Sequence, residues 1–236
     1  MNNQSIDQQN AGIIKTVVSE QALKVLRNAY MLLALSMIPT VIGAYIGVSY
    51  ANVMMAAMTS SPIMGMIVYL ALVFGLLIAI QKTANSAVAI PLMLAFTFVL
   101  GVALGPLLQV ALVVGNGPAL IAYAAGTTAL IFFALASYVT ITGKDFSGLG
   151  KFLFIGLIIG FVGLIANIFF QMPAFSLAVS GFMVLLMSMY ILYDVSRIVH
   201  NGETNYILAA VSLYLNIYIL FTHLLRIMII LTGSRD

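Results

Sequence analysis

Seven long apolar segments, separated by short polar connections, constrain this chain more than any other feature. The hydrocarbon core of a bilayer is about 30 Å thick, and a helix of about 20 apolar residues crosses it. The segments lie at residues 29–48, 63–80, 87–109, 119–141, 152–170, 174–193 and 206–231. Turn-forming or charged residues separate them, and no connection is long enough for a soluble domain. We therefore expect an all-α polytopic membrane protein whose seven transmembrane helices occupy residues 29–232.

Composition supports this class. Hydrophobic residues make up 63% of the chain and charged residues only 6%, whereas a soluble domain carries about 25% charged residues. The net charge of +3 comes from so few groups that it does not indicate a nucleic-acid partner. The chain has no cysteine, which excludes disulfides, thiolate catalysis and cysteine-ligated zinc. We expect no cofactor.

The first 28 residues are expected to form a cytoplasmic tail. Residues 1–12 are polar and expected to be disordered, whereas apolar residues recur at helical spacing among the charges of residues 13–27. That spacing is typical of a short helix lying on the membrane surface. The alternative is an extended tail that continues directly into the first transmembrane helix.

The positions of the basic residues predict the orientation. Every Lys or Arg in a connection falls before the first segment or in the second, fourth and sixth connections: Lys15, Lys24, Arg27, Lys82, Lys144, Lys151 and Arg197. Because basic residues favour the cytoplasmic side, the N-terminus is expected there, and seven crossings place the C-terminus in the periplasm. Arg226 and Arg235 oppose the last step. A re-entrant final segment would return the C-terminus to the cytoplasm.

The last segment carries a line of polar residues. At 100° per residue, Asn205, Ser212, Asn216, His223 and Arg226 fall within about 80° of one another on a helix. Hydrocarbon cannot satisfy amide, imidazole and guanidinium groups, so this polar stripe must face protein or a water-filled cavity. We expect the last helix to be enclosed by the other six.

Asp194 is the only carboxylate close to membrane depth, and Arg197 follows it on the same helical face. One interpretation is a local ion pair at the cytoplasmic interface. The other is a proton-responsive latch or pore in which Asp194 faces Asn216, with His223 as a second titrating group and Arg226 on the same stripe. An enzyme is not expected, because aspartyl chemistry needs two carboxylates. Ser212 and His223 are also too far apart for a nucleophile and its base, at about 16 Å along one helix.

Small residues and prolines recur inside the segments. Pairs of glycines at four-residue spacing let helices approach closely, and ordinary tight packing is the simplest interpretation. The pairs are Gly43/Gly47, Gly101/Gly105 and Gly156/Gly160. Pro39, Pro91 and Pro106 each remove a backbone donor and favour kinks.

Two runs, GVALGPLL (101–108) and AYAAGTTALIFF (122–133), resemble the signature of the Bax inhibitor-1 family. The residues that carry this resemblance are Gly101, Gly105, Pro106, Thr128, Ala129 and Phe132. The segments KVLRNAY (24–30), KTAN (82–85), ANIFFQMPA (166–174), HNGETNY (200–206), VSLY (211–214) and SRD (234–236) are also similar to bacterial members. The resemblance extends from about residue 22 to the end.

The resemblance implies seven helices with the last one enclosed, in a bacterial inner membrane. It implies a regulatory protein that binds the membrane-anchored protease FtsH, both as a substrate and as a modulator, with the N-terminal tail as the segment that the protease grips. Other members are pH-sensitive calcium leak channels gated by aspartates on the sixth and seventh helices. Here Asp194 matches the first aspartate, but Asn216 replaces the second, so any calcium passage is expected to be weak.

Overall fold

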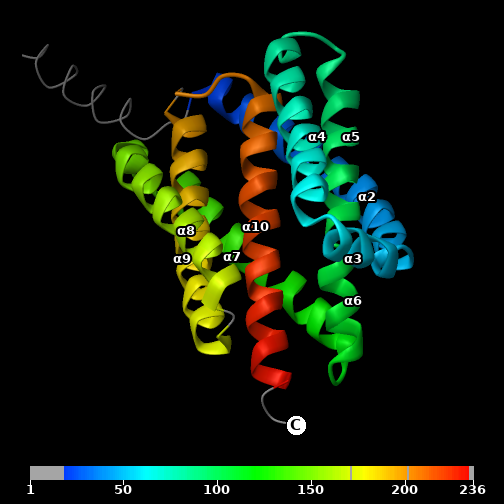
Figure 1. Ribbon diagram of the computed structural model, residues 1–236. Helices are drawn as coiled ribbons and strands as arrows, with labels where there is room; N and C mark the ends of the chain where they lie inside the picture. Colours follow the sequence, from blue (N-terminus) through cyan, green and yellow to red (C-terminus); the bar gives the residue numbers. More distant parts are fainter. Residues whose placement is uncertain (1–18, 171, 201, 234–236) are drawn as a thin grey trace, which may run out of the picture.

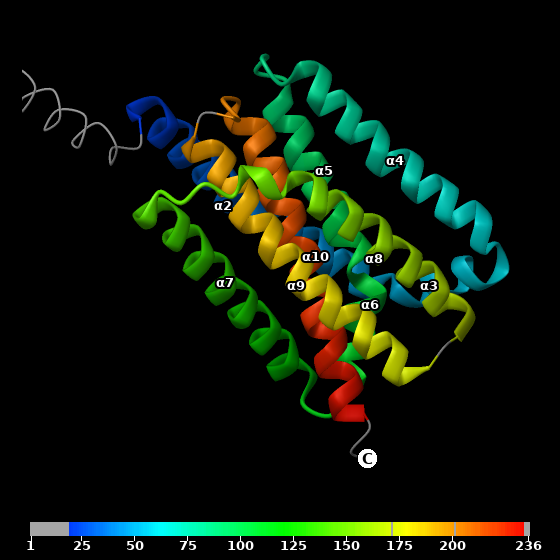
Figure 2. The ribbon, with the colours of Figure 1, turned by 90° about the vertical axis from the view of Figure 1, so that its left-hand side faces the viewer.

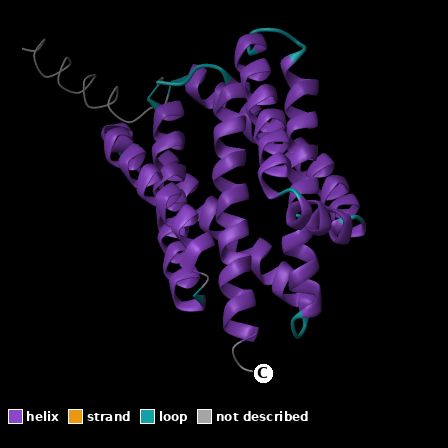
Figure 3. Ribbon diagram, viewed as in Figure 1, coloured by secondary structure: helices purple, strands orange, loops and turns teal. Residues whose placement is uncertain are grey.

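The computed structural model describes residues 19–170, 172–200 and 202–233. Within these residues the chain forms helices and no strand, and seven spans are long and apolar enough to cross a membrane (Figures 1 and 3). The expected all-α class with seven transmembrane helices is confirmed. Residues 1–12, and residues 13–18 of the expected surface helix at 13–27, lie outside the described residues. Residues 20–27 do not form a separate surface helix, because they belong to the first membrane-spanning helix.

The spans follow one another along the chain, and one of them consists of two helices. The helices are α2 (Glu20–Ser49), α3 (Ala51–Ser60), α4 (Pro62–Thr83), α5 (Ala89–Ala103), α6 (Gly105–Val113), α7 (Gly117–Thr142), α8 (Gly150–Phe170), α9 (Pro173–Val199) and α10 (Tyr206–Gly233). A short 3-10 turn, η1 (Ser147–Leu149), precedes α8. The third span is α5 followed by α6.

The first span begins earlier than expected, at Glu20 instead of Ala29. The Ser19 hydroxyl accepts a hydrogen bond from the Ala22 N–H at 3.1 Å, and Glu20 occupies the first turn, where a negative charge is favourable. Because α2 is continuous from Glu20 onward, the charged residues 20–27 form its first turns.

Two further boundaries differ from the prediction. The sixth span ends at Val199 instead of residue 193, because Val195, Ile198 and Val199 are buried and continue the core-facing side of the helix. Asp194 therefore lies inside α9. The connection after α2 contains a helix, α3, that the turn residues at 60–62 did not predict.

The third span breaks at Leu104, two residues before Pro106. The Leu104 N–H bonds to the carbonyls of both Leu100 and Gly101, which tightens the last turn of α5. Pro106 lacks an N–H and occupies the first turn of α6, where none is needed. The sequence predicted a kink at Pro106. In the structure the span is divided there into two helices.

The last helix lies at the centre of the bundle (Figures 1 and 2). It packs against α9 most extensively, then against α2, α7, α6 and α5. Outside this group, α8 covers α9 and α4 covers α5. Four of the other six spans therefore supply most of the enclosure of α10, and α4 and α8 form an outer layer.

The closest packing in the bundle joins α2 to the third span through glycines. A Cβ atom at Gly101 would overlap the backbone of Thr40, and one at Gly105 would overlap the backbone of Gly47. Gly43 approaches the Phe98 carbonyl in the same way. Lipid supplies no hydrophobic drive between helices, so such backbone contact is a main source of association. The tight packing expected from the first two glycine pairs is present.

Candidate functional site

Asp194 and Asn216 meet between α9 and α10. The Asn216 Nδ2 donates a hydrogen bond of 2.7 Å to Asp194 Oδ2. Asp194 is only 9% exposed and Asn216 only 6%. Burial of a carboxylate requires a donor, and the amide supplies one. The contact expected between these residues exists, whereas its role as a latch or pore stays a prediction.

Arg197 does not pair with Asp194. Its Nη2 lies 3.7 Å from Glu203 Oε2, and its guanidinium lies over the ring of Tyr193 at 5.6 Å from the centroid. Among the described residues, no ion pair includes Asp194. The direct Asp194–Arg197 ion pair, one of two interpretations of the sequence, is therefore not formed in this structure. The connection between α9 and α10 brings Glu203 back to the arginine.

His223 is buried but separate from the carboxylate. Its Nδ1 lies 3.3 Å from the hydroxyl of Ser180, near the other end of α9. His223 lies seven positions after Asn216, about 10 Å further along the helix. The imidazole therefore has a hydrogen-bond partner of its own, and the structure does not bring it to Asp194.

The two ends of the polar stripe have different surroundings. Asn205 caps α10: its Oδ1 accepts from the N–H groups of Ile207 and Leu208, while its Nδ2 donates to the Ala84 carbonyl and to Asn85 Oδ1. This residue therefore ties α10 to the connection after α4. Arg226 is partly exposed and forms no ion pair with a described carboxylate. Only the middle of the stripe is deeply buried.

Tyrosines of α10 supply polar contacts that the sequence analysis did not predict. The hydroxyls of Tyr214 and Thr40 share a hydrogen bond at 2.8 Å, which joins α10 to α2. The Tyr218 hydroxyl donates to the Leu100 carbonyl at 3.1 Å, at the end of α5. Their spacing on either side of Asn216 in SLYLNIYIL was the available signal.

A second polar cluster, also missed, joins the connection before α8 to the end of α9. Asp145 Oδ1 accepts from the Ser147 N–H at 2.8 Å and from the Ser196 hydroxyl at 3.1 Å. The Ser196 oxygen accepts from the Phe146 N–H, and the His200 ring contacts the carbonyls of Ser196 and Gly143. Donation by Ser147 is the main reason why the pKa of the Asp145 carboxyl is lowered.

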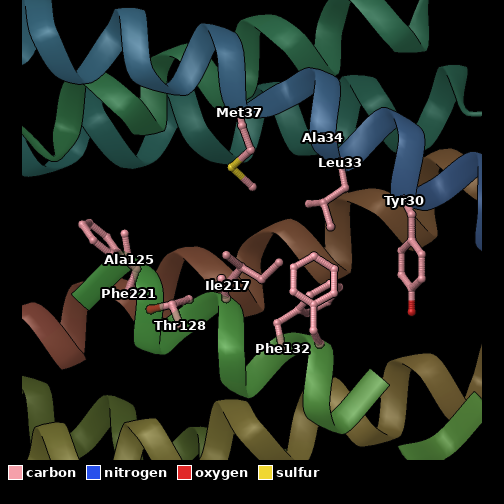
Figure 4. Close-up of a pocket in the computed structure, with 11 residues that line it drawn as sticks. Tyr30, Leu33, Ala34, Met37, Ala125, Thr128, Phe132, Ile217 and Phe221 are labelled. Atoms are coloured by element: carbon pink, nitrogen blue, oxygen red, sulfur yellow. The ribbon is translucent and has the colours of Figure 1, made fainter. Parts of the chain in front are cut away.

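The family-like residues of the third and fourth spans have two structural roles. Gly101 and Gly105 form the close contact with α2, and Pro106 starts α6. On α7, Thr128, Ala129 and Phe132 line an apolar cavity that faces α2 and α10 (Figure 4). No group of three or more His, Asp or Glu side chains that could hold a metal ion occurs in the described part of the chain.

Comparison with known proteins agrees with this architecture. The family model described as "Inhibitor of apoptosis-promoting Bax1" matches residues 22–233, which include all seven spans except the first two residues of α2. The "Modulator of FtsH protease YccA" of Escherichia coli strain K12 is 43% identical over 205 residues, covering 87% of this chain and 89% of that relative. An uncharacterised membrane protein of Vibrio cholerae is 40% identical over 213 residues, covering 89% and 91%.

A further relative covers still more of the chain. An uncharacterised protein of Pseudomonas aeruginosa is 38% identical over 224 residues, which is 94% of this chain and 96% of that relative. Similarity at this level over whole chains, together with the family match across the bundle, is sufficient to assign the family. The chain belongs to the Bax inhibitor-1 family.

Proposed function

We propose that this protein binds the membrane-anchored protease FtsH and modulates its proteolysis of other membrane proteins. The observation that carries the proposal is the 43% identity, across nearly the full length of both chains, to a relative named for that activity. The multi-pass fold is consistent with it, because it would place this protein in the same membrane as the protease.

The proposed interaction has two parts. The protease engages the polar N-terminal tail as it would a substrate, and the bundle then resists extraction from the membrane. Resistance is expected from the backbone contact of α2 with α5, since α2 is the first helix that pulling on the tail would load. A chain that is held and not readily unfolded would occupy the protease and slow its action on other proteins.

Affinity purification from solubilised membranes tests the binding. FtsH is expected to co-purify with the full chain, and deletion of residues 1–12 is expected to slow degradation of the chain by FtsH. The matched control is a chain in which the same twelve positions carry a different polar sequence, which should restore degradation. Absence of FtsH from the purified complex would contradict the binding. Unchanged degradation after the deletion would contradict the role of the tail.

A weak cation leak is a second candidate function. The observation in its favour is the buried hydrogen-bonded pair of Asp194 and Asn216 between two central helices. One carboxylate and one amide offer few of the oxygen ligands that Ca²⁺ prefers. Calcium flux into liposomes containing the purified chain tests this function. Flux that Asp194→Asn abolishes would support it, and equal flux with and without the protein would remove it.

We also propose that the protein lies in the bacterial inner membrane with its N-terminus in the cytoplasm. The end of the bundle that carries Lys24, Arg27, Lys82, Lys144 and Arg197 is called the basic end below, and it would be cytoplasmic. Enzyme-reporter fusions to each terminus test this orientation. A periplasmic signal from an N-terminal fusion would contradict it.

A further inference from the structure

An apolar groove opens on the side of the bundle between α2, α7 and α10 (Figure 4). Its volume is about 400 Å³, within the range of about 300–1,000 Å³ that is typical of small-molecule sites. From α2 the lining includes Tyr30 and Met37, from α7 Ala129 and Phe132, and from α10 Phe221. The Thr128 hydroxyl, which also lines it, already donates to the Ala124 carbonyl at 2.7 Å.

The groove continues toward the other end of the bundle. A second apolar cavity of about 340 Å³ shares Met37, Ala125, Ile217 and Phe221 with the first and reaches Ala44 on α2. From Tyr30 to Met37 the groove runs about 10 Å, and to Ala44 about 21 Å, at 1.5 Å per residue. The hydrocarbon of one leaflet is about 15 Å thick. The groove is therefore long enough for the part of a lipid chain that lies in one leaflet.

Tyr30 lies at one end of this groove, and its hydroxyl oxygen is almost inaccessible. Its ring packs edge-on against Phe132, with the centroids 5.8 Å apart. The hydroxyl is buried, and no described residue offers it a hydrogen-bond partner. A buried hydroxyl without a partner is unfavourable. The structure therefore lacks an acceptor at this point.

Positive charge lies beyond the tyrosine, toward the basic end. Arg27 is exposed, one turn before Tyr30, and lies on the same face of α2 as Tyr30, Ala34 and Met37 by the helical period. No described carboxylate forms an ion pair with Arg27. Basic residues at the membrane surface attract anionic lipid headgroups.

We propose that the groove binds an anionic phospholipid, with one acyl chain lying between α2 and α7. An ester carbonyl accepts a hydrogen bond from Tyr30 once the tyrosine side chain turns so that its buried hydroxyl reaches the groove, and the phosphate lies near Arg27. The groove faces the bilayer, where Ala125, Ala129 and Phe133 are exposed, so acyl chains reach it without any opening of the bundle. This arrangement matches the polarity of the site, because the unpaired hydroxyl found among the described residues and the exposed Arg27 lie toward the same end of α2.

Lipid retention measured by native mass spectrometry tests the proposal. The full-length chain is purified in detergent, given an equal mixture of phosphatidylglycerol and phosphatidylcholine, and the lipids bound per chain are counted. Wild type is expected to retain one phosphatidylglycerol. Arg27→Gln and Tyr30→Phe should each weaken retention about fivefold, the first by removing preference for the anionic headgroup.

Filling the groove provides a matched pair of variants. Ala125→Phe places a ring in the groove and should abolish retention, whereas Ala134→Phe, an exposed alanine on another face of the same helix, should leave it unchanged. Retention that is the same in wild type, Ala125→Phe and Tyr30→Phe would overturn the proposal, and so would equal retention of the two lipids. If Ala125→Phe instead abolished FtsH co-purification with lipid retention intact, the groove would be a helix-docking site and not a lipid site.

Discussion

The two sides of α2 are packed in opposite ways. Toward α5 and α6, glycines bring backbone against backbone. Toward α7, the same helix is separated from its neighbour by the apolar groove. Small residues at the helix interface distinguish the first side, since lipid itself gives no reason for helices to associate. One side therefore holds the bundle together, and the other remains accessible to lipid.

The largest expected loss of stability comes from disrupting the contact of α2 with α5 and α6. Gly105→Leu places a side chain where the backbone of Gly47 already lies, so α2 must move away from the third span. We expect a loss of at least about 3 kcal/mol, or about 10 °C in melting temperature, measured by circular dichroism in detergent. The control is Gly75→Leu on α4, where an added Cβ meets no atom within 4 Å. Equal melting temperatures for the two variants would contradict the difference between the sides.

The second largest loss of stability is expected where α10 contacts α9. Asn216→Leu removes the donor from the buried Asp194 carboxylate and is expected to cost about 2 kcal/mol. Replacing both residues by Leu should cost less than the single change, because no polar group is then left unpaired. Chemical unfolding of the two variants measures this. A double variant that is less stable than Asn216→Leu would show that the pair itself contributes net stability.

Two buried tyrosines that line the groove differ in whether the hydroxyl has a protein partner. Tyr214→Phe loses the hydrogen bond to Thr40, which joins α10 to α2 in the wall of the second cavity, and should cost about 1 kcal/mol. Tyr30→Phe removes a hydroxyl that has no protein partner, so in lipid-free detergent it should be neutral or slightly stabilising. Thermal melts of both variants provide the comparison. An equal loss for both would mean that the Tyr30 hydroxyl has a protein partner.

The smallest expected effect lies at the basic end, where Asp145 joins the connection before α8 to α9. Hydrogen bonds from Ser147 and Ser196 lower the pKa of this carboxyl below its ordinary value of 3.8. The ionised form is thus favoured in the folded protein, so its contribution is full above pH 3.8 and disappears as the pH falls through the lowered pKa.

Asp145→Asn should therefore cost less than about 1 kcal/mol at pH 7, because the carboxylate is more than half exposed. The melting temperatures of wild type and variant are expected to converge below pH 3.8. Ser196→Ala, which leaves the Ser147 donor in place, should have a smaller effect. A gap between wild type and Asp145→Asn that widens in acid would contradict the assigned hydrogen bonds.

Much of the fold could be predicted from the sequence, because a bilayer requires apolar segments of a certain length and requires polar side chains to face protein or water. Both requirements can be read from residues that are close together in the chain. Apolar length identified the seven spans, and helical period identified the buried face of Asn216 and His223. Neither property reveals which group on another helix meets a side chain. Asn216 faces Asp194 as expected, but His223 meets Ser180, which sequence spacing alone could not identify.

The features that the sequence did not reveal depend on contacts between distant segments. Asp145 and Ser196 are 51 positions apart and meet only because α7, α8 and α9 bring their ends together. The groove is a space left between three helices, so no single segment carries a signal for it. The start of α2 differs from the prediction for another reason. Residues 13–27 were expected to form a separate helix on the membrane surface, whereas residues 20–27 continue without a break into the first span.

Proteolysis in reconstituted membranes is the most direct measurement of the proposed function. Purified FtsH and a membrane protein that it degrades are placed in proteoliposomes, with ATP, in the presence and absence of this protein. The degradation rate is expected to fall as the amount of this protein rises, and to recover when the destabilised Gly105→Leu variant replaces wild type. An unchanged rate at a molar excess of the wild-type chain would contradict the assignment of this protein as a modulator of FtsH.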